Sequence, residues 1–115
     1  MRESNPNFMN GVPELLVLRL LREREMYGYE LAQAIRDRSG EAIAFGEGVI
    51  YPVLHALERD GALSSYRKTV NGRSRVYYAL TPAGTNRLAD LAGSWTRLNS
   101  AIHLILAGGN HAEAV

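Results

Sequence analysis

Cysteine is absent from this chain of 115 residues. Without thiols there can be neither a disulfide framework nor a thiolate metal site. The three histidines (His55, His103 and His111) are too scattered to suggest a metal-binding cluster. We therefore predict no metal site and no cofactor, and we interpret His103 as a residue of a helix surface.

Long apolar runs are also absent, because charged residues interrupt every run well short of a membrane span. The first eight residues have no apolar core like that of a signal peptide. The sequence also lacks the GxSxG and HExxH motifs and a glycine-rich phosphate-binding loop. We therefore expect a cytoplasmic protein that has no membrane partner and is not an enzyme.

Net charge is small, since 13 Lys and Arg residues face 12 Asp and Glu residues and leave a formal charge of +1. Any binding to nucleic acid must then depend on where the charges lie. Within residues 61–80 the charged residues are all basic: Arg67, Lys68, Arg73 and Arg75. A nearly neutral chain therefore contains one basic segment.

Residues 48–61 have the pattern of an amphipathic helix. The apolar residues at i, i+3, i+4 and i+7 are Ile50, Val53, Leu54 and Leu57. Because Pro52 cannot donate a backbone hydrogen bond, we predict that the regular ladder starts near it. Residues 48–51 would then form an opening turn whose free amides suit a phosphate. Gly61 can take positive φ and is the predicted end.

Two further helices are predicted before this one. Pro13 at a first helical position, followed by a leucine-rich run, predicts a largely buried helix that ends near Glu25. After the Tyr-Gly-Tyr sequence at 27–29, apolar residues at helical spacing predict a second helix that closes near Gly40. Residues 42–45 are expected to form a brief strand or to anchor against the sheet.

A β-hairpin is predicted after Gly61, because Asn71-Gly72 separates two strand-like runs at 63–70 and 73–80. In a two-residue type I′ turn the cross-strand pairs are Val70 with Arg73, Lys68 with Arg75, and Tyr66 with Tyr77. One face would expose the basic side chains and two tyrosines, while the other packs on the helices.

One long helix is predicted between Thr81-Pro82, which favours a helix start, and Gly108-Gly109. About 25 residues would extend about 37 Å, which is too long for a small domain to cover. An unbroken series of apolar residues alternates spacings of three and four: Leu88, Leu91, Trp95, Leu98, Ile102 and Ile105. We predict that this series, which we call the seam, is the interface of a homodimer.

Three helices followed by a hairpin are the order of a winged helix-turn-helix, a mainly α (α+β) fold in which the third helix reads DNA. We expect a flexible arm at 1–12, the DNA-binding domain at 13–80, a dimerisation helix at 81–107 and a disordered tail at 108–115.

Four motifs carry a resemblance to a known family: Tyr27-Gly28-Tyr29-Glu30-Leu31, Ile50-Tyr51-Pro52-Val53-Leu54, Leu57-Glu58-Arg59-Asp60-Gly61 and Arg75-Val76-Tyr77-Tyr78-Ala79-Leu80-Thr81-Pro82-Ala83-Gly84. With them the chain resembles the PadR-like transcriptional regulators from about Pro13 to Leu106. The single C-terminal helix is similar to the short branch of that family, and Ser94-Trp95 to its multidrug-binding regulators. The resemblance implies a homodimeric repressor that binds an inverted repeat.

In this scheme, backbone amides near Gly48 and the Tyr51 hydroxyl hold phosphates, exposed side chains of the helix read bases, and the hairpin arginines add electrostatic attraction. For Tyr29 the alternative is a core position, for Tyr51 and His55 it is an exposed position without a DNA contact, and for the hairpin tip it is simple solvation. The predicted DNA contacts are Tyr29, Gln33, Gly48, Val49, Tyr51, Pro52, His55, Lys68, Asn71, Gly72, Arg73 and Arg75.

Trp95 has two interpretations. At a seam position it is most simply a large apolar anchor of the dimer. The resemblance implies a second role, in which two Trp95 rings line a pore and stack on a flat hydrophobic effector, with Leu91, Leu98 and Asn99 nearby. The alternative function is a winged-helix adaptor that binds proteins and not DNA, which an acidic or apolar hairpin would favour.

Overall fold

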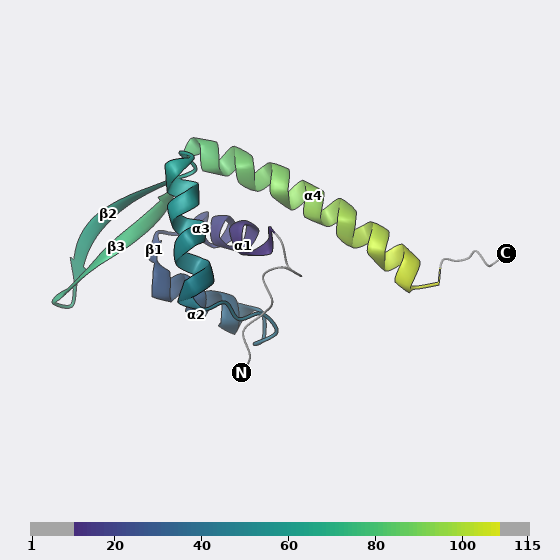
Figure 1. Ribbon diagram of the computed structural model, residues 1–115, viewed down its shortest axis with the longest axis horizontal. Coiled ribbons are helices and arrows are strands. Elements are labelled where there is room, and N and C mark those ends of the chain that lie inside the picture. Colours follow the sequence, from purple (N-terminus) through teal and green to yellow (C-terminus); the bar gives the residue numbers. More distant parts are fainter. Residues whose placement is uncertain (1–10, 109–115) are drawn as a thin grey trace.

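The computed structural model of the protein describes residues 11–108 and shows four helices and a three-stranded antiparallel sheet within that range (Figure 1). The elements are α1 (Val12–Leu21), β1 (Met26–Tyr27), α2 (Gly28–Arg38), α3 (Glu47–Arg59), β2 (Leu63–Val70), β3 (Arg73–Leu80) and α4 (Pro82–Leu106). The predicted mainly α winged fold is confirmed. The predicted arm and tail fall almost wholly outside the described residues. Within residues 11–108 no helix is long and apolar enough to cross a membrane.

Helices α1, α2 and α3 share one apolar core, in which Leu18, Leu31 and Leu54 have no exposed surface. The predicted end of α1 near Glu25 is wrong, because the helix ends at Leu21. The charged residues 22–25 have no apolar side to bury, so they form the turn that leads Met26 into the sheet.

The sheet has the order β1-β3-β2, and β1 pairs with β3 through Met26 with Tyr78 and Tyr27 with Tyr77. Strand β1 was not predicted, because two residues are too few to show alternation. The strand considered for residues 42–45 does not form. Phe45 is instead buried in the core of the helices.

The predicted register of the β2–β3 hairpin, called the wing below, is confirmed at all three cross-strand pairs. Asn71 and Gly72 have φ of 54° and 78°, as a type I′ turn requires. The prediction that both tyrosines of one face are exposed is wrong, since Tyr66 is 42% exposed but Tyr77 only 7%. The Tyr77 ring is covered because β1 brings Tyr27 against it, with ring centroids 5.3 Å apart.

Helix α3 begins before Pro52, and the Val49 and Ile50 amides donate to the Gly46 carbonyl at 3.0 and 3.1 Å. The predicted opening turn with free amides is therefore wrong for these two groups. The ring of Pro52 removes only its own N–H, so the residues before it can still form a helical turn.

The end of α3 is a Schellman motif, in which the Gly61 amide donates to the Glu58 carbonyl at 3.0 Å and the Ala62 amide to that of Leu57 at 2.9 Å. Gly61 has φ of 84°, which confirms it as the predicted stop. The chain leaves this motif directly into β2.

Helix α4 starts against that same turn. The Thr81 hydroxyl lies 2.7 Å from the Gly61 carbonyl oxygen and accepts a bond from the Gly84 amide at 3.0 Å. The Thr81 amide donates to the Ala62 carbonyl at 3.1 Å. Gly84 is buried, and a Cβ on it would lie 2.1 Å from the Ala62 oxygen. Only glycine therefore lets the two backbones approach this closely.

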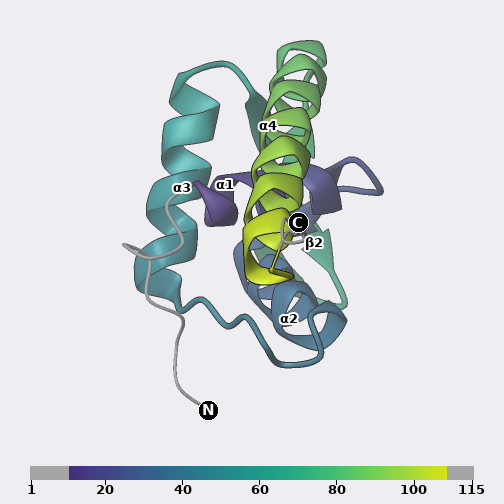
Figure 2. The ribbon, with the colours of Figure 1, turned by 90° about the vertical axis from the view of Figure 1, so that its right-hand side faces the viewer.

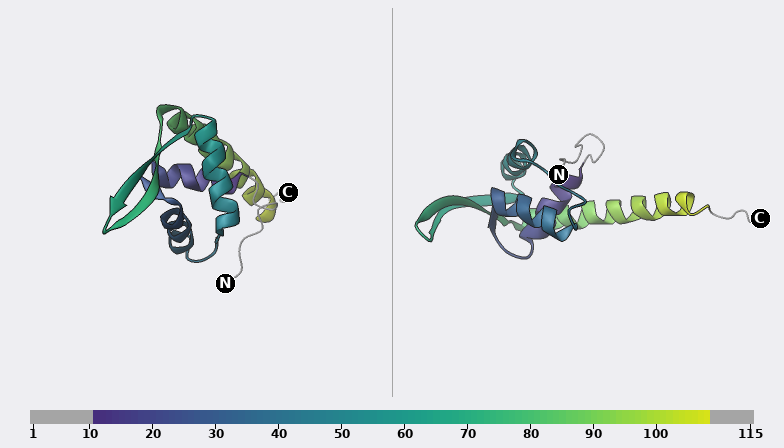
Figure 3. Two further views of the ribbon diagram at one scale, coloured as in Figure 1. Left: turned by 60° about the vertical axis from the view of Figure 1, so that its left-hand side comes forward. Right: turned by 90° about the horizontal axis from the view of Figure 1, so that it is seen from below.

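The distal part of α4 leaves the domain, so that α4 and the wing extend to opposite sides of the helical core (Figures 1 and 3). In Figure 2 α4 slopes toward the viewer, with its C-terminal end nearest. Leu88 is only 3% exposed because its own copy of the chain buries it, so the prediction that it meets a second copy is wrong. Beyond it Leu98 is 53% and Ile105 79% exposed.

We expect Gly84→Ala to lower the free energy of unfolding by about 3 kcal/mol, because the added methyl group overlaps a backbone carbonyl that cannot move without shifting α3. Gly93→Ala in the same helix is the matched control, since its Cβ would meet only the end of the Arg97 side chain at 3.4 Å. That control should be neutral or should stabilise by up to roughly 1 kcal/mol. Urea unfolding measures both, and equal stability of the two variants would contradict the close approach.

Candidate nucleic-acid interface

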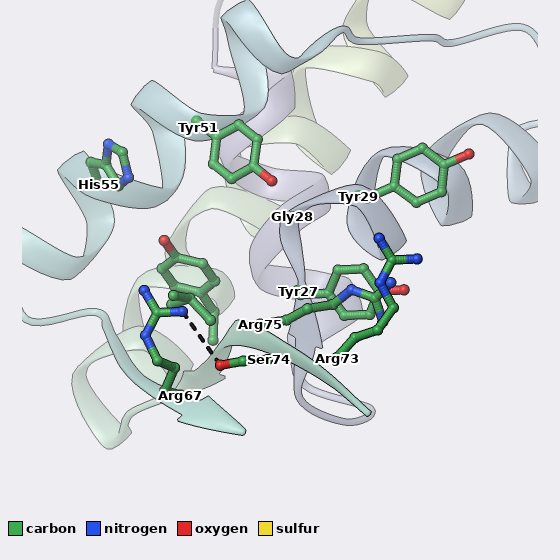
Figure 4. A pocket seen from close by; sticks show the side chains of 11 residues that line it. Tyr27, Gly28, Tyr29, Tyr51, His55, Arg67, Arg73, Ser74 and Arg75 are labelled. Atoms are coloured by element: carbon green, nitrogen blue, oxygen red, sulfur yellow. Dashed lines mark hydrogen bonds between the residues drawn. The ribbon is translucent and has the colours of Figure 1, made fainter. Parts of the chain in front are cut away.

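A hollow of about 580 Å³ lies between the start of α2, the outer side of α3 and the wing (Figure 4). Aromatic and basic side chains predominate in it, and none of its lining residues is acidic. The lining residues are Tyr27, Gly28, Tyr29, Tyr51, His55, Arg67, Arg73, Ser74, Arg75, Val76 and Tyr78. Such a surface suits an anionic ligand with flat or sugar-phosphate parts.

Tyr51 and His55 enter the hollow from α3, and their ring centroids lie 6.2 Å apart. The Tyr51 ring packs so closely on α2 that a Cβ on Gly28 would lie 2.6 Å from it. Burial raises the pKa of the Tyr78 hydroxyl, and the nearby Glu58 acts in the same direction. Both effects disfavour the phenolate form of Tyr78. The Tyr51 ring is held at a fixed place on α3 by its close packing against Gly28.

Three arginines reach the hollow from the wing. The Arg67 guanidinium is 3.5 Å from the Ser74 hydroxyl, and that of Arg75 lies 4.4 Å from the centroid of the Tyr27 ring. Arg73 is exposed. Within residues 11–108 none of the three forms an ion pair with a carboxylate, so their positive charges remain available to a ligand.

The hollow brings together five of the predicted DNA contacts: Tyr29, Tyr51, His55, Arg73 and Arg75. It does not include the other predicted contacts on α3 and at the wing tip, namely Gly48, Val49, Pro52, Asn71 and Gly72. Those residues lie at the start of α3 and in the turn of the wing. The predicted DNA contacts therefore form a central group in the hollow and two separate groups, one at the start of α3 and one in the turn of the wing.

Gln33 and Lys68 have partners within the protein. The Gln33 amide donates to the Asp37 carboxylate at 3.2 Å and accepts from Arg36 at 3.3 Å. The Lys68 ammonium pairs with Glu25, and the hydrogen bond to this carboxylate raises the pKa of the lysine. Neither residue lines the hollow.

Sequence reasoning missed Arg67 as a site residue. Strand alternation places Arg67 on the face that was expected to pack on the helices, opposite Lys68 and Arg75. The helices cover only the base of that face, where Leu63 and Tyr78 are buried. The length of the strands was the available signal, because an eight-residue hairpin extends past a small domain and leaves its distal half open.

A second, smaller hollow of about 160 Å³ lies between the start of α1 and α4. Three of the predicted effector residues line it, namely Leu91, Trp95 and Leu98, together with Gly11, Val12, Leu15 and Ser94. Asn99, the fourth predicted effector residue, is not among them. This hollow is mainly apolar, in contrast to the basic hollow beside α3.

The three-helix core, the basic wing and the exposed side of α3 together define a winged helix-turn-helix of the DNA-binding class. The sequence model of the transcriptional regulator PadR-like family matches residues 17–90. The chain belongs to this family of transcriptional regulators, whose members bind DNA.

Individual relatives agree with this assignment. The chain is 36% identical over 83 residues to the transcriptional regulator Rv3488 of Mycobacterium tuberculosis, covering 72% of this chain and 75% of the relative. A transcriptional regulator from Clostridium thermocellum superposes with a TM-score of 0.78 at 28% identity, over 84% of this chain and 95% of that one. A PadR family transcription regulator from Clostridium difficile gives 0.74 at 28% identity, over 84% and 99%.

Proposed function

We propose that the protein is a sequence-specific repressor that binds an inverted-repeat operator as a symmetric homodimer. In each copy α3 enters the major groove and the wing lies along the neighbouring backbone or minor groove. The observation that supports this most directly is the shared hollow, where three arginines that have no carboxylate partner among residues 11–108 line the same walls as Tyr51 and His55 of α3. A repressor must share a compartment with its operator, so we infer a cytoplasmic location.

The wing supplies most of the electrostatic attraction to DNA, because α3 itself attracts phosphates only weakly. The charged residues of α3 and its cap are Glu47, Glu58, Arg59 and Asp60, which sum to a negative charge. The exposed residues along α3 include Gly48, Pro52 and His55. Nothing lies within 4 Å of a Cβ built on Gly48, so a groove edge could approach α3 closely there. Shape and a few polar groups of α3 would select the sequence.

The homodimer is supported by the exposed apolar side chains of α4. Leu98, Ile102 and Ile105 recur at seam spacing on the part of α4 that leaves the domain. A second copy of the same helix is the simplest cover, because the pattern is self-complementary. Pairing of two α4 helices would also set the distance between two copies of α3, which must match about 34 Å for successive major grooves.

A small planar hydrophobic compound is the effector that the second hollow favours. Its walls are apolar apart from Ser94, and the Trp95 ring offers a face for stacking. The hollow is small and open in one copy, so in the proposed dimer the partner would complete it. Binding there would change how α4 packs and thereby the spacing of the two α3 helices.

The alternative, a protein-binding adaptor without DNA, is less well supported. An adaptor has no need for a wing in which three arginines remain without acidic partners among residues 11–108. Neither role calls for catalysis, and we propose none.

Binding to the DNA upstream of the protein's own gene should weaken steeply with salt, because each neutralised phosphate releases a counterion. Arg73→Ala combined with Arg75→Ala should reduce the slope of log K against log salt by about 2. Fluorescence anisotropy over a salt series measures this slope. Arg22→Ala is the control, because Arg22 is exposed and lies outside the hollow. Binding that is indifferent to salt and to the double substitution would refute the proposal.

Light scattering should give the mass of a dimer for the unaltered protein and of a monomer for Ile102→Asp. The reason is that a carboxylate at a seam position must be desolvated when two α4 helices pair. Ser100→Asp serves as the matched control, because residue 100 lies on the opposite side of α4 from Leu98 and should keep the dimer. Circular dichroism verifies that both variants fold. A monomeric parent protein, or a dimer that survives Ile102→Asp, would count against pairing through the seam.

Fluorescence of Trp95, the only tryptophan, should be quenched in a saturable way by planar compounds such as acridine and naphthalene derivatives. Stacking of a flat ring on the indole is the expected cause. N-acetyltryptophanamide at equal absorbance corrects for light absorbed by the compounds. A titration no different from that of the free amide would remove the support for an effector at this hollow.

A further inference from the structure

Glu25 joins the turn after α1 to strand β2 of the wing. Its carboxylate accepts hydrogen bonds from the Tyr66 hydroxyl and from the Lys68 ammonium. These contacts link residues more than 40 positions apart in the sequence. No other ion pair within residues 11–108 connects the wing to the helical core.

The Lys68 side chain is held on two sides. Its Nζ lies 4.7 Å from the centroid of the buried Tyr77 ring, while Glu25 takes the ammonium hydrogens. Tyr77 is fixed in turn by the edge of the Tyr27 ring and by the Tyr66 ring, whose centroid is 6.3 Å away. We call Glu25, Tyr27, Tyr66, Lys68 and Tyr77 the wing-base cluster.

The wing-base cluster divides the four basic residues of the wing into two groups. Arg67, Arg73 and Arg75 line the hollow and have no carboxylate partner within residues 11–108. Lys68 does not line it, and its charge is matched by Glu25. The hydrogen bond to Glu25 raises the pKa of Lys68, which favours the protonated amine. The same bond directs the ammonium toward the core and away from the hollow.

We propose that Glu25 is a positioning residue that withholds Lys68 from DNA and fixes the wing on the core. The wing then presents three positive charges instead of four. This inference rests on the proposed DNA binding. Phosphate contacts add affinity for any sequence, so a fourth free cation would raise non-specific binding without aiding base recognition. Glu25 therefore favours discrimination between DNA sequences over total affinity for DNA.

The test measures the salt slope on a random-sequence DNA duplex for four proteins: the parent, Glu25→Gln, Lys68→Met and the double variant. Glu25→Gln should tighten binding and steepen the slope by about 0.9, because one more phosphate contact forms. Lys68→Met alone should leave the slope unchanged. The double variant should return to the parent slope, since the added contact requires Lys68.

Glu23→Gln is the matched control. It removes the same charge two positions away, where Glu23 pairs with Arg19 at 2.8 Å and Arg38 at 2.7 Å and not with the wing. Its slope should match that of the parent. A different result would be that Glu25→Gln tightens binding by the same factor in the Lys68→Met background as in the parent. In that case the loss of general charge repulsion would explain the effect, and the inference would be wrong.

The remaining outcomes separate this inference from the proposed function. A parent protein without salt-dependent DNA binding refutes the proposed function itself. A parent that binds, with a Glu25→Gln slope that does not change, refutes only the role of Glu25. A slope that flattens by about 0.9 in Lys68→Met alone shows that Lys68 already reaches phosphate, and this outcome overturns the inference even if Glu25→Gln fails to fold.

Discussion

Two short segments, the end of α3 and the start of α4, are joined by hydrogen bonds from Thr81 to the Gly61 and Ala62 carbonyls. The missing side chain of Gly84 makes this contact possible. Arg87 braces it one turn further along α4 by reaching both Glu14 of α1 and Asp60 at the end of α3, the latter at 3.4 Å. The helix proposed to read DNA and the helix proposed to pair two copies are therefore one mechanical unit. Any change in the direction of α4 must displace α3 or break these bonds.

The wing is attached to that unit differently. Its base is held by the short strand β1 and by the wing-base cluster, while its tip extends beyond the helices. In the proposed complex this arrangement would separate two requirements of DNA recognition. Position along the groove would depend on α3 and α4, which are joined by hydrogen bonds near the backbone. Electrostatic attraction would depend on side chains in the part of the hairpin that extends beyond the helices.

Local sequence patterns predicted most of the fold. Asn71-Gly72 set the wing register, Thr81-Pro82 set the start of α4, and helical spacing located α3. What could not be predicted depends on contacts between distant residues. Strand β1 exists only because β3 is beside it, and Tyr77 and Lys68 are covered by groups that the chain brings from 50 and 43 positions away. For the candidate site, residue type identified Arg73 and Arg75, but only the three-dimensional path of the hairpin showed that Arg67 lines the hollow and Lys68 does not.

The exposed apolar side of α4 also has a consequence for how the regulator would respond to its own abundance. One copy carries one α3 and one wing, and so would hold half of an inverted repeat. In the proposed homodimer the amount of binding-competent protein rises with the square of the free monomer concentration while monomers predominate. Occupancy of the operator would then follow changes in synthesis more steeply than single-site binding allows. A helix whose first role is to join two subunits would thereby also set the threshold at which a gene is switched off.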